Sequence, residues 1–257
     1  MQTELVTKIH DQALELRVRD LLLNLLTVSS GAVNAISFLA LGKVFSAFMT
    51  GNIAFLGLRV AGAPAPGAVA IVASVAAFAA GVYLSTRIVK SSERSGMWPQ
   101  RVTVALGVSL IGHAVFLAVW FASNGEPTIE VAHVLLGSWA LAMGMQSAAV
   151  RTLHVEGVFT TAATATIIYL AGDITNWSAT VAERRRFAGV LVSLFVGATT
   201  GGLLLVHAHI YAPVLPFVIT LVAVATAAIV FRKRDAGDER DFPSRDDRTP
   251  DRHVRHC

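Results

Sequence analysis

The sequence has few charged residues and a single cysteine, and both shortages narrow what the chain can be. Only 15% of its 257 residues are Asp, Glu, Lys or Arg, whereas 54% are hydrophobic and the mean hydropathy is +0.61. A soluble domain averages about 25% charged residues, so a water-soluble globule is excluded. The cysteine, Cys257, excludes a disulfide framework and a cysteine-based metal centre. The first 20 residues are polar and mixed in charge, unlike a secretory signal.

Charge is concentrated at the two ends of the chain and in short linkers. Residues 21–231 carry only sixteen charged side chains, while the tail from Arg232 onward carries fifteen. The sequence pI of about 9.6 comes from scattered basic linkers, so we expect no nucleic-acid partner. A body so poor in charge needs the lipid bilayer as its solvent.

Long apolar runs predict six membrane crossings, because a helix needs about 18–25 apolar residues to cross a bilayer. The predicted crossings are 21–42, 67–86, 102–123, 131–150, 187–208 and 212–231. Two further apolar stretches, 44–58 and 158–172, are shorter and carry Thr, Gly, Asn or Ala where a simple crossing would carry Leu and Ile. We expect them to be re-entrant or broken helices, and eight crossings are the alternative.

The charge of the linkers favours six crossings. Basic residues gather before residue 20, in the 87–101 and 183–186 linkers and at Arg232–Arg234, whereas 124–130 and 207–212 have no Lys or Arg. Because cytoplasmic loops carry the excess of Lys and Arg, all basic groups lie inside if both termini are cytoplasmic and the short stretches do not cross. Lys43 and Arg59 are minor exceptions.

An internal repeat relates the two halves of the chain. Its first copy contains Gly31, Ala35, Val44, Phe45, Thr50 and Leu56, which recur as Gly144, Ala148, Val158, Phe159, Thr164 and Leu170. The offset is 113 residues at the start and 114 after a one-residue insertion. Three crossings per copy would invert the second copy relative to the first, an architecture typical of many secondary transporters.

We therefore predict an all-α fold, a polytopic transmembrane helical bundle with six crossings, two short re-entrant or broken helices and an inverted internal repeat. Its parts are a cytoplasmic N-terminal segment (1–20), a first transmembrane repeat (21–123), a second transmembrane repeat (129–232) and a charged cytoplasmic tail (233–257). The tail alternates acids and arginines with Pro243 and Pro250, so we expect it to be disordered.

Three stretches carry a family resemblance. GAVNAISFLALGKVFSAFMTGNIAFLG, AMGMQSAAVRTL and VFTTAATATIIYL are similar to the YoaK family of bacterial inner-membrane proteins, a domain of unknown function. The resemblance covers roughly residues 20–232 and implies a multi-pass protein of the bacterial inner membrane, with no established activity. The chain departs from the family pattern at Asn34, where the family usually has Asp, at Ser147, where it has Asn, and at Ala165, where it often has Gly.

Polar residues in the two short stretches and in the crossings before them are the candidate binding residues. They are Asn34, Thr50, Gly51, Asn52, Gln146, Thr161, Thr164 and Thr166. Hydroxyls, amides and exposed backbone could bind a small polar solute, as in transporters with broken helices. The same residue types also let helices approach closely and hydrogen-bond one another, so packing is the alternative role.

The remaining polar groups suggest no cofactor and no metal site. His113 is the one clearly internal ionisable residue, and a histidine bonded to a neighbouring backbone is the simpler reading than a proton relay. His207 and His209 form an H-x-H pair without Cys or nearby carboxylates, which favours interfacial anchoring over metal binding.

These patterns favour a small secondary transporter or permease for a polar solute. The chain has no GxxxxGK[ST] loop, so it does not itself use ATP. The alternative is a non-transporting assembly factor, sensor or partner subunit, and the sequence does not fix the oligomeric state. We expect no enzyme, because the crossings carry no Ser/His/Asp set, no H-E-x-x-H and no carboxylate pair.

Overall fold

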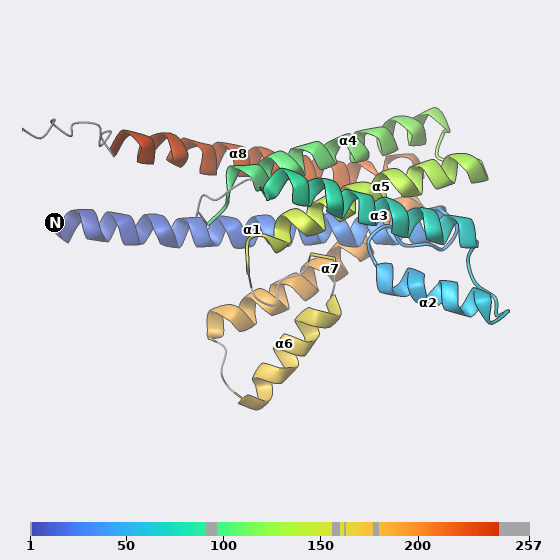
Figure 1. The fold of residues 1–257 in the computed structure, drawn as a ribbon, viewed down its shortest axis with the longest axis horizontal. Helices are drawn as coiled ribbons and strands as arrows, with labels where there is room; N and C mark the ends of the chain where they lie inside the picture. Colours follow the sequence, from blue (N-terminus) through green and yellow to red (C-terminus); the bar gives the residue numbers. More distant parts are fainter. Residues whose placement is uncertain (1, 91–96, 156–159, 162, 177–179, 242–257) are drawn as a thin grey trace, which may run out of the picture.

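The computed structural model describes residues 2–90, 97–155, 160–161, 163–176 and 180–241. Within them every regular element is a helix (Figure 1). The elements are α1 (Gln2–Ala40), α2 (Met49–Val60), α3 (Ala68–Val89), α4 (Gln100–Ala122), α5 (Ile129–Arg151), α6 (Ala163–Asn176), α7 (Val181–His207), the 3₁₀ turn η1 (His209–Tyr211) and α8 (Val214–Asp241). The predicted helical membrane bundle is confirmed.

Five helical segments in the described part of the chain are long and apolar enough to cross a membrane. They are Gln12–Ala40, Ala68–Val89, Gln100–Ala122, Val181–His207 and His209–Phe231, which match five of the six predicted crossings. The sixth, 131–150, is the 23-residue helix α5, which is as long as α4 but less apolar. Its crossing of the membrane stays a prediction.

The two short stretches form helices that are too short to cross. Helix α2 has 12 residues and α6 has 14, which at 1.5 Å per residue makes them about 18 and 21 Å long. The hydrocarbon core of a bilayer is about 30 Å thick. Residues 41–48, before α2, are not helical, and Gly42 and Lys43 have positive φ angles of 84° and 62°. The chain therefore turns back after α1 and starts a new helix.

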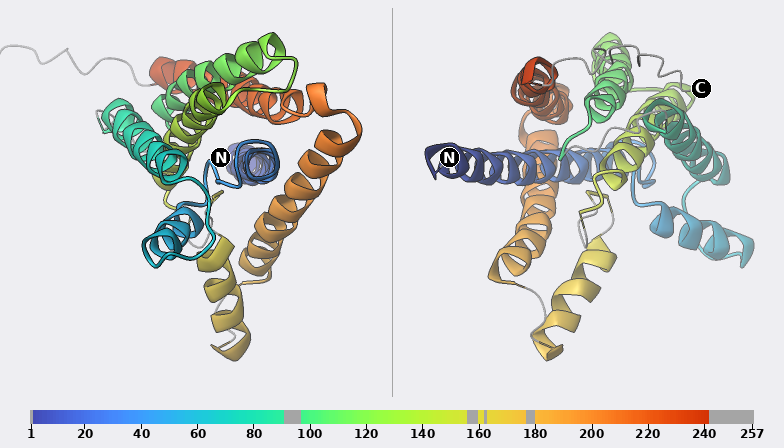
Figure 2. Two further views of the ribbon diagram at one scale, coloured as in Figure 1. Left: turned by 90° about the vertical axis from the view of Figure 1, so that its right-hand side faces the viewer. Right: turned by 60° about the vertical axis from the view of Figure 1, so that its left-hand side comes forward.

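Helices α1 and α5 form the inside of the bundle. The apolar stretch of α1 is 67% buried, against 22–39% for the other four candidate crossings. Twelve residues of α5 are buried, including Gln146 and the run from Ala148 to Val150. Figure 2 shows α1 end-on, surrounded by the other helices. A helix enclosed by protein does not have to be apolar toward lipid, which explains how α5 accommodates His133 and Gln146.

The contacts between helices fall into two sets with the same pattern. Helix α3 packs along α5 and α7 packs along α1, while α4 covers α5 and α8 covers α1. Helix α2 lies on α3 and α6 lies on α7, and contacts of α4 with α8 and of α1 with α5 join the two sets. Each of the contacts named here has a counterpart in which α1 is replaced by α5, α2 by α6, α3 by α7 and α4 by α8, or the reverse.

Glycines sit at the two tightest crossings. A Cβ at Gly144 of α5 would meet the carbonyl oxygen of Phe78 in α3, and one at Gly81 of α3 would meet that of Leu141 in α5. The α1–α7 crossing repeats this pattern: Gly31 faces the carbonyl oxygen of Leu194 and Gly197 faces that of Val28. Because glycine has no side chain, the backbones of the two helices can touch at each crossing, as in close-packed membrane helices.

The outer faces of the bundle are apolar. Exposed large hydrophobic side chains are distributed over α3, α4, α7 and α8, including Val72, Ile111, Phe195 and Ile229. Such a surface would aggregate in water, and lipid solvates it. The exposed apolar faces agree with a membrane protein that crosses the bilayer several times.

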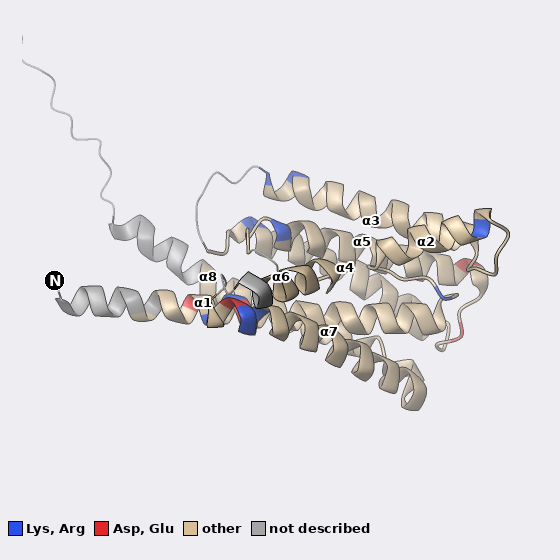
Figure 3. Cartoon of the chain, turned by 90° about the horizontal axis from the view of Figure 1, so that it is seen from below, with Lys and Arg blue, Asp and Glu red and all other residues tan. Residues whose placement is uncertain are grey.

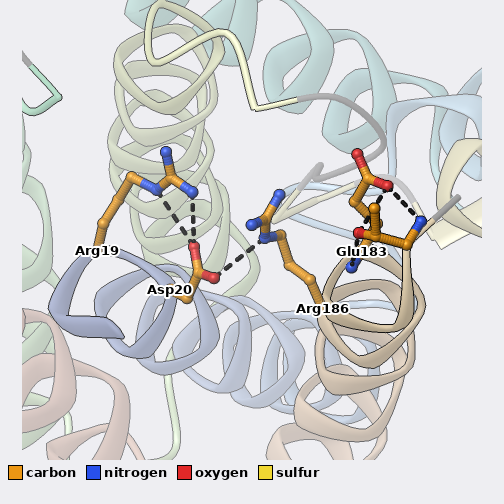
Figure 4. Close-up of polar contacts among 5 residues, drawn as sticks. Arg19, Asp20, Glu183 and Arg186 are labelled. Carbon is orange, nitrogen blue, oxygen red and sulfur yellow. Dashed lines mark hydrogen bonds and ion pairs between the residues drawn. The ribbon is translucent and has the colours of Figure 1, made fainter. Parts of the chain in front are cut away.

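One end of the bundle is basic. The chain starts at this end, and Lys and Arg gather there, while the other end has few of them (Figure 3). At the basic end Arg186 Nε of α7 is 3.1 Å from Asp20 Oδ2 of α1, and Arg19 binds the other oxygen of Asp20 at 2.9 Å (Figure 4). Glu183 and Thr180 form a capping box that starts α7 in the same region. The ion pair thereby links the middle of α1 to the first turns of α7.

The helical part of the C-terminus is longer than the sequence predicts. Helix α8 continues to Asp241, into the region assigned to a disordered tail from residue 233, and residues 242–257 lie outside the described residues. Lys, Arg, Glu and Ala in this extension have good helix propensity, and the helix ends two residues before Pro243, whose ring disfavours helix in the residue that precedes it.

Candidate functional site

Asn34 holds the turn that follows α1. Its Oδ1 accepts hydrogen bonds from the backbone N–H groups of Ala47 (3.0 Å) and Phe48 (3.3 Å), and its Nδ2 donates to the carbonyl oxygen of Ser30 (2.9 Å). The side chain is buried. Its polar atoms are used by the protein's own backbone, so in this conformation Asn34 stabilises the turn and is closed to a solute.

Asn52 fastens α2 to the same turn. Its Oδ1 accepts from Phe45 N–H (3.0 Å), and its Nδ2 donates to Phe45 carbonyl oxygen (2.7 Å) and lies 3.3 Å from Ser74 Oγ of α3. Ser74 Oγ also donates to that carbonyl, at 2.8 Å. Of its two predicted neighbours, Thr50 is exposed and Gly51 packs against the Phe45 ring, with its would-be Cβ at 3.2 Å. In the first half of the chain, the side chains of Asn34 and Asn52 are thus hydrogen-bonded to the protein itself.

The second half brings Gln146 and Thr161 to one place. Gln146 Nε2 donates to the Leu26 carbonyl oxygen of α1 (3.1 Å) and to Thr160 Oγ1 (3.4 Å). Ser147 Oγ and Thr161 Oγ1 are 3.0 Å apart. Thr164 is exposed on α6 and Thr166 is buried there. Gln146 therefore ties α5 to α1, beside a group of three hydroxyls.

A cavity of about 480 Å³ lies next to these hydroxyls. Its walls come from the end of α3, the end of α5 and the chain that follows α5, and they consist of Val82, Thr86, Ser147, Ala148, Val150, Arg151, Thr152, His154, Thr160 and Thr161. The volume lies in the range of pockets that take small molecules, about 300–1,000 Å³. Since α3 and α5 both end at the basic end of the bundle, the cavity lies toward that end (Figure 3).

The cavity joins candidates that the sequence separates and adds residues that the sequence reasoning did not select. It contains Thr161 and lies beside Gln146, but it also takes Arg151 and His154 from the end of α5 and Thr86 from α3. Spacing along the chain gives no sign of the Thr86 contribution, which arises from the packing of α3 on α5. Asn52 and Thr166 do not meet, because α2 and α6 lie at different positions along the bundle (Figure 1).

The histidines outside the cavity, His113 and His209 among them, form no metal site within the described residues. The ring of His113 is buried 6.3 Å from the Trp139 ring, and neither of its nitrogens has a hydrogen-bond partner among the described residues. The ring of His209 lies 5.1 Å from that of Trp120. No group of three or more His, Cys, Asp or Glu that could hold a metal ion occurs in the part of the chain that the structure describes.

The helices, their apolar outer faces and an apolar core that holds a few hydrogen-bonded polar side chains define a polytopic helical membrane protein. Comparison with known proteins agrees with this class. Residues 22–226 match the model of the family described as "Protein of unknown function (DUF1275)", and the chain belongs to this family. It is 33% identical, over 158 residues, to the UPF0700 transmembrane protein YoaK of Bacillus subtilis (strain 168). These aligned residues make up 62% of this chain and 68% of the relative. The predicted YoaK-family membership is thus confirmed. No solved structure matches.

Proposed function

We propose that the chain is a small secondary transporter of the bacterial inner membrane, that its two halves are an inverted repeat, and that its basic end is cytoplasmic. The observation that carries this proposal is a difference between two positions that the repeat aligns. Ser147 lines the cavity and is only partly buried, whereas its repeat counterpart Asn34 is buried and its oxygen is bound by the backbone N–H groups of Ala47 and Phe48. One half is open toward the basic end and the other half is closed.

The glycine crossings support the repeat. Gly31 and Gly144 are aligned by the 113-residue offset, and so are Val28 and Leu141. Each contact at the α1–α7 crossing then has its counterpart at the α3–α5 crossing, with the partner helices exchanged. A pseudo-two-fold axis that exchanges α1 with α5 and α7 with α3 produces this pattern, and such an axis lies in the membrane plane for inverted repeats.

The open and closed halves suggest how transport proceeds. If the halves exchange conformations, the chain around Ser147 closes at the basic end and the chain around Ser46 opens at the opposite end. Ser46 Oγ is buried without a hydrogen-bond partner within the described residues, which would make the closed state of its half easier to leave. Alternating exposure of a central site is the transport mechanism of inverted-repeat carriers.

Cysteine labelling tests this exchange. In the full chain with Cys257→Ser, Ser147→Cys and Ser46→Cys each add one thiol at nearly constant volume. We expect a membrane-impermeant maleimide to label Ser147→Cys from the basic side and Ser46→Cys, more slowly, from the other side. In the double variant, intact-mass measurement should find one bulky label per molecule rather than two, because the two exposures exclude each other. Leu106→Cys, fully buried in the core, is the unlabelled control.

Labelling of Ser147→Cys with no labelling of Ser46→Cys from either side would refute alternation and leave a static pocket. The alternative of a non-transporting assembly, sensor or partner subunit would then be favoured. Two labels on the double variant would also contradict the proposal, because both halves would be open at once.

A further inference from the structure

The cavity beside Thr161 has two chemically different walls. Val82, Ala148 and Val150 provide an apolar wall, and hydroxyls of Ser147, Thr160 and Thr161 provide a polar one. Arg151, the last residue of α5, and His154, three residues beyond it, line the same cavity. A ligand that fits these walls has an apolar body and a polar head.

The charge of the residues on the polar wall determines which charge the head of the ligand should carry. The guanidinium of Arg151 has no ion pair or hydrogen bond with any of the described residues. Asp20 and Glu183, two carboxylates of the basic end, are engaged by Arg19, Arg186 and the Thr180 cap. An arginine that lines a cavity beside Ser and Thr residues, and that has no carboxylate partner among the described residues, is suited to a carboxylate or phosphate group.

The surroundings of the cavity add to the attraction. Arg87 and Lys90 follow Thr86 around the end of α3, and Arg101 is the second residue of α4 at the same end. A cluster of one sign raises the local concentration of ions of the opposite sign and speeds their arrival. Anions are thus drawn to this end of the bundle before any of them reaches Arg151.

We propose that this cavity binds an oxyanion group, a carboxylate or a phosphate, that is attached to an apolar body, with Arg151 as the main contact of the anion. Resting on the proposed transport function, this names the class of solute that the protein carries. The Thr160 hydroxyl, which accepts from Gln146, donates a hydrogen bond to the same group. The hydroxyls of Ser147 and Thr161 can donate to it once they release the Met143 carbonyl oxygen and each other, and the apolar wall receives the body. A free organic anion and the headgroup of an anionic lipid both offer this chemistry.

Protection of a cavity thiol measures binding directly. Val82→Cys in the full chain with Cys257→Ser places the thiol on the apolar wall without removing any polar group of the proposal. In nanodiscs of neutral phosphatidylcholine, we expect benzoate, octanoate and phenyl phosphate to slow maleimide labelling at least fivefold more than benzamide and octanamide do. Arg151→Gln should weaken this protection about tenfold, the loss expected for one charge-assisted hydrogen bond, while Arg151→Lys keeps part of it.

The matched control is Arg87→Gln. Arg87 lies at the same end of the bundle and hydrogen-bonds Tyr83 outside the cavity, so its loss should leave protection nearly unchanged. Arg151 is exposed, so its replacement should not disturb folding, and an unchanged size-exclusion profile checks this. Nanodiscs that contain phosphatidylglycerol separate the two sources: Arg151-dependent protection by this lipid alone assigns the site to a headgroup.

Equal protection by the acids and their neutral amides, with no effect of phosphatidylglycerol, would overturn the proposal, and so would full protection in Arg151→Gln. The result is separable from transport. If anions protect the thiol but Ser46→Cys and Ser147→Cys do not label alternately, the anion site is supported and the transport function is contradicted. If the labels alternate but anions give no protection, the transport function is supported and the anion site is contradicted.

Discussion

Gly144→Ala is the sharpest test of how this bundle is held together. The added methyl group would meet the carbonyl oxygen of Phe78, with the carbonyl carbon of that residue only 2.9 Å away. These atoms belong to the backbone of α3, so no side chain can rotate to make room. Helix α5 must therefore separate from α3 along the crossing, and the packing around it is lost.

The size of the effect follows from overpacking. Extra methyl groups in well-packed cores typically cost about 1–3 kcal/mol, and a backbone clash belongs at the upper end of that range. Gly137, on the same helix, has nothing within 4 Å of its would-be Cβ. Its replacement by Ala should gain up to about 1 kcal/mol of helix propensity. The two single-methyl changes should thus differ in stability by about 2–4 kcal/mol, with opposite signs.

The measurement is unfolding of both variants in mixed micelles with increasing SDS, followed by circular dichroism beside the unchanged protein. The midpoint of Gly144→Ala should fall and that of Gly137→Ala should stay or rise. Gly31→Ala, at the equivalent α1–α7 crossing, should lose about as much as Gly144→Ala. Equal midpoints for Gly144→Ala and Gly137→Ala would refute the close crossing, and an unaffected Gly31→Ala would refute the equivalence of the halves.

Three further outcomes are expected. Asn52→Ala strands the backbone N–H of Phe45 and should lower unfolding stability by about 1–3 kcal/mol, whereas Thr50→Ala, on the exposed face of α2, should leave the SDS midpoint unchanged. Asp20→Asn weakens the partly exposed link to α7 and should lower stability by no more than about 1 kcal/mol; an effect that persists undiminished in high salt would contradict this explanation. Lys90→Cys should label from the same side of the membrane as the N-terminus and Glu126→Cys from the other side; labelling of both from one side would exclude six crossings.

Most helices could be predicted from hydropathy, and the errors lie at their ends. The structure starts α7 at Val181, six residues before the predicted crossing, because Thr180 and Glu183 cap a charged first turn that hydropathy does not register. Helix α8 passes its predicted end for a similar reason. A hydropathy pattern indicates only the part of a helix that lies within the lipid. The helix itself continues into water until a cap or a proline ends it.

The polar candidates could be found from the sequence, but their roles could not. Asn34 and Asn52 stand out as amides in apolar surroundings. In the structure both side chains hydrogen-bond backbone groups of the turn at 45–48. Whether an amide binds a solute or its own chain depends on where the chain folds back. That path is set by the packing of α2 on α3, which no local pattern records.

The sequence by itself determined the membrane environment, the helical class, the two short helices and the positions related by the 113-residue offset, because composition and periodicity act within single segments. Only the tertiary structure decided which of those positions are open. Arg151 and Thr86, 65 positions apart in the chain, reach one cavity because glycines let α3 and α5 touch. Contacts between segments depend on the shapes of both surfaces, so the cavity appears only once the helices are packed.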